Sequence, residues 1–280
     1  MRYALNVPNV GDLDTLLALG TEAEAAGWDG FFVWDQMGFM RDVPVTVFDP
    51  WVLLAAVAER TERIRLGTMI TPLARRRPWK LARETVTLDH LSGGRVILGA
   101  GLGFPPDADF ELLGEDPDPR VRAGKLDEGL EVLTRLWSGE PVHFDGDHFH
   151  VHEARFLPRP VQRPRIPLWI AGGWPTKAPF RRAARWDGVY PLGLEADGEM
   201  VPLWAEAYPD LLAFVRDHRP SRDPFDVVAS GTADGDPAVV APFAEVGATW
   251  WVESDEGTPG WESRMAERIR RGPPSGQSGG

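Results

Sequence analysis

Short apolar runs alternate with amphipathic stretches along almost the whole chain. The runs rich in Val, Ile and Leu predict buried strands, and the stretches after them repeat apolar residues every three or four positions, as helices do. The first such helix ends at Gly27, as helices often end at Gly. The predicted strands are Arg2–Val7, Gly30–Trp34, Ile64–Ile70, Arg95–Ala100, Leu168–Ala171, Gly188–Pro191, Asp226–Ser230 and Thr249–Val252.

A predicted helix follows each predicted strand. Alternation of this kind favours a parallel sheet, and eight such units in about 270 residues favour an α/β fold closed into a (β/α)8 TIM barrel. An open doubly wound sheet is the alternative. It has the same alternation of strands and helices and differs from the barrel in strand order, which the sequence does not show. The predicted helices are Gly11–Ala26, Pro50–Arg60, Pro78–Leu91, Val121–Trp137, Thr176–Arg185, Glu199–Asp217, Pro237–Val246 and Trp261–Arg270.

Two segments interrupt this rhythm. Residues 140–167 contain Asp145-Gly146-Asp147 between two β-like runs, which predicts a β-hairpin inserted before the fifth strand. Residues 272–280 consist of Gly, Pro, Ser and Gln, which predicts a disordered tail. We therefore expect one barrel domain over residues 1–271, followed by the tail 272–280.

Composition narrows the class of protein. The chain has 280 residues and no Cys, which excludes disulfides, thiolate metal sites and a Cys nucleophile. Its net charge of −12 argues against general nucleic-acid binding. No stretch approaches the roughly 20 apolar residues that span a bilayer, and Met1–Asn6 lacks the apolar run of a signal peptide. We expect a cytoplasmic protein that acts on a small molecule, without nucleic-acid or membrane partners.

A glycine-rich segment follows the fourth predicted strand. Active sites of such barrels lie at the C-terminal ends of the strands, and Gly lets backbone approach a ligand closely. Gly99-Ala100-Gly101-Leu102-Gly103 therefore indicates either a cofactor contact or an ordinary bend. The dinucleotide fingerprint is excluded, because Phe104-Pro105-Pro106 stands where that motif begins a helix.

A second segment, Ala171–Lys177, joins the fifth strand to its helix. The free N–H groups at a helix start bind phosphate, and Thr176 and Lys177 add a hydroxyl and a charge. A capped helix without a ligand is the alternative. The run Arg75-Arg76-Arg77 suits an anionic ligand as well as pairing with surface carboxylates.

The predicted hairpin is rich in histidine. His148, His150 and His152 alternate, so they would share one face of a strand, with His143 nearby. Such a cluster could bind zinc and would then indicate a metal-dependent barrel hydrolase. A hydrated strand face is the favoured interpretation, because the hairpin lies far in sequence from the other loops, and we predict no metal site.

Several segments together resemble the luciferase-like monooxygenase family. Their order and spacing along nearly the whole chain carry the resemblance, since each piece alone is weak. The segments are Trp28–Gly30, Trp34-Asp35, Ile64–Pro72, Arg77-Pro78, Leu88–Arg95, Gly99–Gly103, Pro164–Gly173 and Ala184–Gly188.

The resemblance implies a barrel that holds FMN or the deazaflavin coenzyme F-420 at its C-terminal mouth. Family members are monooxygenases, reductases or dehydrogenases, and the resemblance also implies a homodimer. It places a strand bulge at Thr68, Met69 and Ile70 against the cofactor ring, with a non-prolyl cis peptide at Met69–Ile70. It places further cofactor contacts at Gly101, Leu102, Gly103, Ala171, Gly172, Gly173, Trp174 and Thr176.

The chain departs from the family where acid–base groups are expected. In the luciferases and in several deazaflavin dehydrogenases that the chain resembles, a catalytic His follows the second strand. This chain has Asp35-Gln36 there, and Gln exchanges no proton near neutral pH. Phe104 stands where some deazaflavin dehydrogenases carry a catalytic Glu. Asp35 and Gln36 remain the catalytic candidates, with Asp35 as a base, a ligand-orienting group or a structural partner.

Two working expectations follow for the site. The apolar substrate pocket would be lined by Trp34, Met37, Phe39, Phe104 and Trp174. Arg75–Arg77 favours F-420, whose tail is polyanionic, over FMN. Gln36 leaves a second hypothesis open, a barrel that binds the cofactor without catalysis.

Overall fold

Eight parallel strands close into a barrel in the computed structural model, which describes residues 1–38, 45–196 and 198–274. Pairing of β8 with β10 closes the ring, so the predicted barrel is confirmed and the open doubly wound sheet is wrong. Around the barrel the strands are β1 (Arg2–Val7), β2 (Gly30–Val33), β3 (Arg65–Pro72), β4 (Val96–Gly101), β7 (Leu168–Trp174), β8 (Gly188–Leu194), β10 (Asp226–Gly231) and β11 (Trp250–Ser254).

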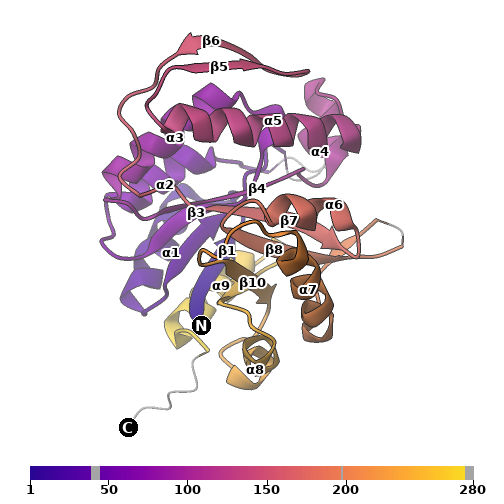
Figure 1. Ribbon diagram of the computed structural model, residues 1–280. Helices are drawn as coiled ribbons and strands as arrows, with labels where there is room; N and C mark the ends of the chain where they lie inside the picture. Colours follow the sequence, from indigo (N-terminus) through magenta and orange to yellow (C-terminus); the bar gives the residue numbers. More distant parts are fainter. Residues whose placement is uncertain (39–44, 197, 275–280) are drawn as a thin grey trace.

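Helices surround the barrel on its outer face (Figure 1). Several begin with an Asp cap followed by Pro, as at Asp49 and Asp118, because the Asp carboxylate accepts free N–H groups and Pro has none to lose. The helices are α1 (Leu13–Ala25), α2 (Pro50–Ala58), α3 (Pro78–Leu91), α5 (Pro119–Trp137), α6 (Lys177–Ala183), α7 (Tyr208–His218), α8 (Pro237–Glu245) and α9 (Trp261–Arg271).

The predicted helix Glu199–Asp217 is wrong in nearly its first half, residues 199–207. That stretch forms a short strand, β9 (Met200–Val201), and a 3-10 turn, η3 (Ala205–Ala207), before α7 starts at Tyr208. Pro209 explains the late start, because proline is tolerated in the first turn of a helix and not in its interior. The sequence analysis also missed three short elements, η1 (Leu73–Arg75), α4 (Pro106–Asp109) and η2 (Glu111–Leu113).

The predicted hairpin is present between α5 and β7. Its strands, β5 (Val142–Asp145) and β6 (His150–Ala154), pair antiparallel and lie along α5, at the top of Figure 1. Glu128 on α5 holds the turn, because its carboxylate accepts the backbone N–H groups of residues 147, 148 and 149 at 2.8, 2.9 and 3.0 Å.

Aromatic side chains fill the lower half of the barrel. The rings of Phe32, Trp169 and Trp250 pack together with centroids 5.1 to 6.3 Å apart. The carboxylate of Asp226 accepts the indole N–H of Trp169 and that of Trp250, each at 3.1 Å. The N-terminal end of the barrel is therefore closed, which leaves the C-terminal end for a ligand.

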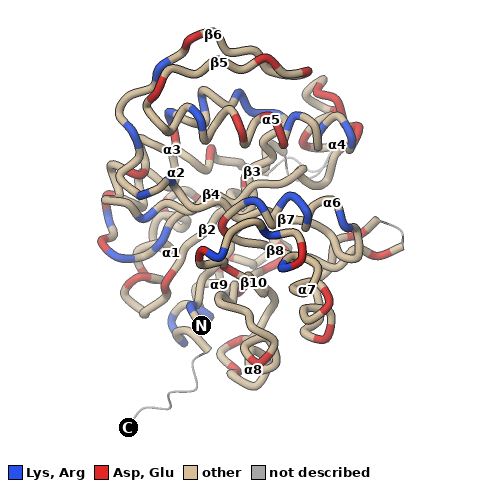
Figure 2. The backbone as a smooth tube through the Cα atoms, viewed as in Figure 1, with Lys and Arg blue, Asp and Glu red and all other residues tan. Residues whose placement is uncertain are grey.

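Two further observations concern the surface. In Figure 2 the charged residues lie mainly on the helices and loops, with both signs interspersed. Within the three described ranges, no helix is both long and apolar enough to cross a membrane.

Candidate active site

The barrel interior opens at the C-terminal ends of the strands. Ile70, Ala171 and Leu192 pack against the interior cluster but are only partly buried, whereas Trp169 and Trp250 below them are fully buried. This is the end at which (β/α)8 barrels carry their active sites. We call this opening the mouth.

One side of the mouth is apolar. It is formed by inward positions on β3, β4 and β7, namely Ile70, Gly101 and Ala171. A Cβ on Gly101 would lie 2.2 Å from Cδ1 of Ile70, so glycine is needed there to admit the isoleucine. The expected bulge is present, since the β3–β4 register shifts between Thr68 and Thr71, whose hydroxyls lie 2.7 Å apart.

The peptide Met69–Ile70 is cis, as the resemblance implies. Beside it, the loop after β4 is held by the protein itself. Arg122 donates to the carbonyls of Leu102 and Gly103 at 3.2 and 3.0 Å, and Gly103 adopts a φ of 88°, which favours glycine.

The other side of the mouth is polar. Side chains alternate between the two faces of a strand, so Asn6, two residues after the interior Ala4, faces inward on β1. By the same alternation Ser230 faces inward on β10 and Ser254 on β11. Ser230 Oγ donates to the phenol oxygen of Tyr190 on β8 at 3.3 Å. Sequence reasoning missed this side, although Asn6 and Ser230 stand out within apolar strands.

Asn6 and Asn9 have opposite environments. Asn9 is fully buried and satisfied, because its Nδ2 donates to the carbonyls of Gln36 and Phe48 at 2.9 and 2.7 Å, and its Oδ1 accepts the N–H of Gln36 at 3.4 Å. Asn6 is 5% exposed, and its buried Oδ1 has no hydrogen-bond partner. A buried amide without a partner costs about 1–3 kcal/mol.

Asp35 is an internal ion-pair partner. Its side chain is fully buried, and Arg76 binds both carboxylate oxygens, Nε to Oδ2 at 2.8 Å and Nη2 to Oδ1 at 2.6 Å. Arg75 adds a contact to Oδ1 at 3.1 Å and donates to the Asp35 carbonyl. Burial lowers the pKa of Arg76, but the charge of Asp35 and the hydrogen bonds with it raise that pKa above its ordinary value overall.

This pairing revises one interpretation of the arginine run. Arg75 and Arg76 neutralise the carboxylate of Asp35, so they are not available to an anionic ligand. That carboxylate is buried, whereas the alternative had been pairing with surface carboxylates. Arg77 is exposed, with its guanidinium 5.8 Å from the ring of Trp79. The argument for F-420 from Arg75–Arg77 therefore loses two of its three residues.

Asp109, which the sequence analysis missed, extends this network. It lies on α4, with Oδ2 at 3.6 Å from Arg75, and its Oδ1 accepts the N–H of Met37 at 3.0 Å. Burial raises its pKa, with Arg75 and the Met37 N–H acting in the opposite direction. The loops after β2, β3 and β4 are thus joined by buried charges.

The expected substrate-pocket residues are spread around the mouth. Trp34 is half-buried at the end of β2, whereas Met37 and Phe104 are 52% and 46% exposed. Gln36 donates its Nε2 to the Phe104 carbonyl at 3.2 Å, and its buried Oε1 has no partner. Phe39 lies outside the described residues.

The start of α6 offers fewer donors than expected. Thr176 caps this helix, but its side chain makes no capping hydrogen bond, and Pro179 in the first turn has no N–H. The ammonium of Lys177 lies 3.4 Å from the ring centroid of Trp174, so it faces an aromatic ring and not the helix start. Gly172 is needed for packing, because a Cβ there would lie 2.1 Å from Cβ of Pro179.

The histidine cluster does not assemble into a metal site. No group of three or more His, Cys, Asp or Glu residues in the described ranges is placed to hold a metal ion. His148 lies in the turn and not on β6, and His150 Nδ1 is 2.6 Å from Asp145 Oδ1. The ligand set that a metal-dependent hydrolase needs is thus not found in these ranges.

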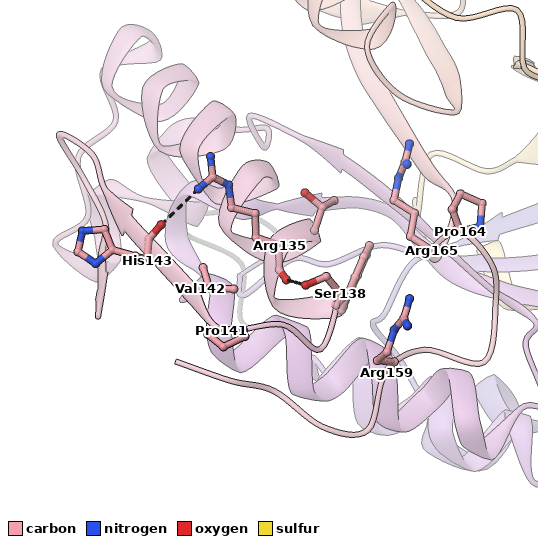
Figure 3. A pocket seen from close by; sticks show the side chains of 10 residues that line it. Arg135, Ser138, Pro141, Val142, His143, Arg159, Pro164 and Arg165 are labelled. Atoms are coloured by element: carbon pink, nitrogen blue, oxygen red, sulfur yellow. Dashed lines mark hydrogen bonds between the residues drawn. The ribbon is translucent and has the colours of Figure 1, made fainter. Parts of the chain in front are cut away.

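A separate groove of about 490 Å³ lies outside the barrel. Figure 3 shows it beside the C-terminal end of α5, where Arg135 donates to the carbonyl of His143 at 3.3 Å. Arg135 also pairs with Glu131, and Arg165, which lines the groove, pairs with Asp187 at 2.8 Å. Because α5 runs back toward the N-terminal ends of the strands, this groove is remote from the mouth.

Comparison with known proteins identifies a family whose model matches most of the chain. The family model described as luciferase-like monooxygenase matches residues 2–239. The chain is 37% identical over 185 residues to 4-hydroxyprotoasukamycin monooxygenase of Streptomyces nodosus subsp. asukaensis, covering 64% of this chain and 48% of that protein. It is 33% identical over 181 residues to F-420-dependent glucose-6-phosphate dehydrogenase of Amycolatopsis mediterranei, covering 64% and 53%. The matched segment spans about half the length of these relatives.

Solved structures match over nearly the full chain. The coenzyme F-420-dependent tetrahydromethanopterin reductase from Methanopyrus kandleri superposes with a TM-score of 0.77 at 17% identity, covering 97% of this chain and 98% of that one. The monooxygenase RslO1 from Streptomyces bottropensis superposes with a TM-score of 0.73 at 22% identity, with the same coverage. At such identities the likeness shows the fold.

Proposed function

Because the chain belongs to the luciferase-like monooxygenase family, we propose that it is an oxidoreductase or monooxygenase that uses FMN or F-420 on a small organic molecule. One observation carries the proposal. In the described part of the chain, the mouth has an apolar wall, Ile70, Gly101 and Ala171, and a polar wall, Asn6, Tyr190 and Ser230. A planar ring fits the first wall, and a small polar molecule fits the second.

The residues present fit a flavin-type cofactor. Ile70, Gly101 and Ala171 offer an apolar surface in which glycine leaves room for the isoleucine side chain, and Ile70 and Ala171 pack against the interior cluster that contains Met69. Thr68, Leu102 and Gly103 shape that wall and its rim. The phosphate would lie at Gly172–Thr176, where Gly173, Trp174 and the free hydroxyl of Thr176 are the nearest groups. When bound, the cofactor supplies hydride transfer or oxygen activation.

The chain itself then binds, orients and excludes water. Asp35 serves to hold the loop after β2, because both of its carboxylate oxygens are taken by arginines, and we assign it no proton transfer. Gln36 acts through hydrogen bonds only, with its buried Oε1 as an acceptor for a ligand donor. Trp34, Met37 and Phe104 form an apolar rim that shields the reacting atoms from water.

The test is a fluorescence titration of the purified protein with FMN and, separately, with reduced and oxidised F-420. Micromolar or tighter binding of one cofactor supports the proposal and identifies the cofactor. A folded protein that binds neither would overturn it.

Gln36 favours a second candidate, a barrel that binds the cofactor without catalysis. The position offers no titratable group, and its neighbour Asp35 is neutralised. Oxidation of the reduced cofactor by oxygen or an added acceptor, faster with the protein than without it, would exclude this candidate. We also propose a homodimer, which light scattering would show as the mass of two chains.

A further inference from the structure

We propose that Asn6, Tyr190 and Ser230 form a subsite that binds the hydroxyl or carbonyl group of an uncharged substrate. The inference rests on the proposed function, since it names the substrate class of that same mouth. Its evidence is a buried side chain without a partner, a hydroxyl pair and the absence of charge on the surrounding wall.

Asn6 carries the first argument. The residue is 5% exposed, and its buried Oδ1 accepts no hydrogen bond from any residue in the described ranges. Asn9, three residues later, is satisfied by Gln36 and Phe48. The fold therefore pairs the amide of Asn9, just after β1, and leaves Oδ1 of Asn6, on the inward face of β1, without a partner. A ligand that bonds with Asn6 removes the penalty of the unpaired amide.

Tyr190 and Ser230 supply the second argument. The Ser230 hydroxyl donates to the phenol oxygen, so the phenol proton of Tyr190 is left to donate to a ligand. Burial raises the pKa of Tyr190, so the phenol stays protonated at neutral pH. The wall thus offers a donor at Tyr190 and both a donor and an acceptor at Asn6. A hydroxyl group complements this set fully, and a carbonyl oxygen complements its donors.

The third argument is charge. Inward side chains of alternate strands form successive layers in these barrels. Among the described residues, the side chains at inward strand positions near the mouth are uncharged, so a carboxylate or phosphate placed against them would lose its hydration without gaining a counter-ion from these strands. These inward residues are Asn6, Trp34, Met69, Ile70, Gly101, Ala171, Tyr190, Leu192, Ser230, Val252 and Ser254.

The first experiment measures thermal unfolding of Asn6→Leu and of its matched control, Asn9→Leu. Asn6→Leu replaces an unpaired amide by an apolar group of similar size, so its melting temperature should rise. Asn9→Leu leaves two carbonyls and one N–H unpaired, so its melting temperature should fall. A lower melting temperature for Asn6→Leu would show that the amide is structural and would overturn the subsite.

The second experiment uses cyclohexanol, cyclohexanone and cyclohexanecarboxylate as probes at millimolar concentrations. The two neutral probes should raise the melting temperature of the wild-type protein, and the carboxylate should not. In Asn6→Leu the apparent affinity for the neutral probes should fall about tenfold, with a similar fall in Tyr190→Phe. An equal response to the carboxylate, no response to the neutral probes, or an unchanged response of Asn6→Leu would each overturn the subsite.

The third measurement separates this inference from the proposed function. Asn6→Leu should bind FMN or F-420 as tightly as the wild type, because the apolar wall lies on β3, β4 and β7. Loss of cofactor affinity in this variant would reassign Asn6 to the cofactor and overturn the substrate subsite. Failure of the wild type to bind either cofactor would overturn the proposed function alone, because the melting experiments need no turnover.

Discussion

Arg76 binds both carboxylate oxygens of Asp35, at 2.8 and 2.6 Å, although the two residues are 41 positions apart. The Asp35 side chain is fully buried, and that of Arg76 is 13% exposed. This pair, extended by Arg75 to Asp109, joins three loops around the mouth. The loops are therefore positioned before any ligand binds.

Asp35→Asn should destabilise the protein by about 3 kcal/mol, because it leaves two buried guanidinium groups without their main counter-charge. Urea unfolding of the two proteins measures this difference. Glu267→Gln is the control, since its pair with Arg271 is exposed and its loss should change stability by less than about 0.5 kcal/mol. Equal effects of the two variants would contradict a structural role for the Asp35 network.

Asp109→Asn should change the dependence of stability on pH. Burial holds the folded pKa of Asp109 above its ordinary value of 3.8. The folded protein therefore binds this proton more tightly than the unfolded chain does. The wild type should lose stability relative to Asp109→Asn as pH rises from about 3.8 through the raised folded pKa, and the difference should be constant above it.

Asp255→Asn should change the pH dependence of stability in the opposite direction. Burial raises the pKa of Asp255, but hydrogen bonds and charge from Arg264, together with Arg268, lower it overall. The wild type should gain stability relative to this variant as pH rises through the folded pKa toward 3.8. Urea unfolding at a series of pH values checks both variants, and slopes of the same sign would refute the assignment.

Glu128→Gln should loosen the hairpin without affecting the barrel. The carboxylate accepts three backbone N–H groups, and the neutral amide accepts them more weakly. Hydrogen exchange at residues 147–149 should accelerate about tenfold, which corresponds to about 1.4 kcal/mol. Glu131→Gln on the same helix should leave these amides unchanged, because Glu131 pairs with Arg135.

Gly172→Ala should weaken cofactor binding at the start of α6. The added Cβ would lie 2.1 Å from Cβ of Pro179, whose ring cannot turn away, so the helix must shift from β7. We expect at least about a tenfold loss of FMN or F-420 affinity, or about 1.4 kcal/mol. Gly38→Ala is the control, because its nearest contact would be the Ala108 carbonyl at 3.8 Å. Unchanged affinity in Gly172→Ala would remove α6 from the cofactor site.

The order of strands and helices could be predicted because it depends on local periodicity. The apolar pattern of a strand or helix, and the residues that end it, lie within or next to that element in the sequence. Asp145-Gly146-Asp147, at the turn of the hairpin, is an example. The error at Glu199–Asp217 has a local cause too, since Pro209 was not used to set the helix start. The bulge at Thr68–Ile70, in contrast, was expected from the family resemblance and not from periodicity.

The residue pattern was enough to predict the eight βα units, the hairpin, the family and the loops that surround the mouth, whereas the β8–β10 pairing decided between barrel and open sheet. The roles of the polar side chains in those loops emerged from the three-dimensional fold, because they depend on residues distant in the chain. It paired Asp35 with Arg75 and Arg76, turned Lys177 onto Trp174, and satisfied Asn9. It also left Oδ1 of Asn6 without a hydrogen-bond partner among the described residues. In register with Asn6 are Phe32 on β2, which has no polar side-chain atom, and Ser254 on β11, whose Oγ donates to the Val252 carbonyl at 3.5 Å.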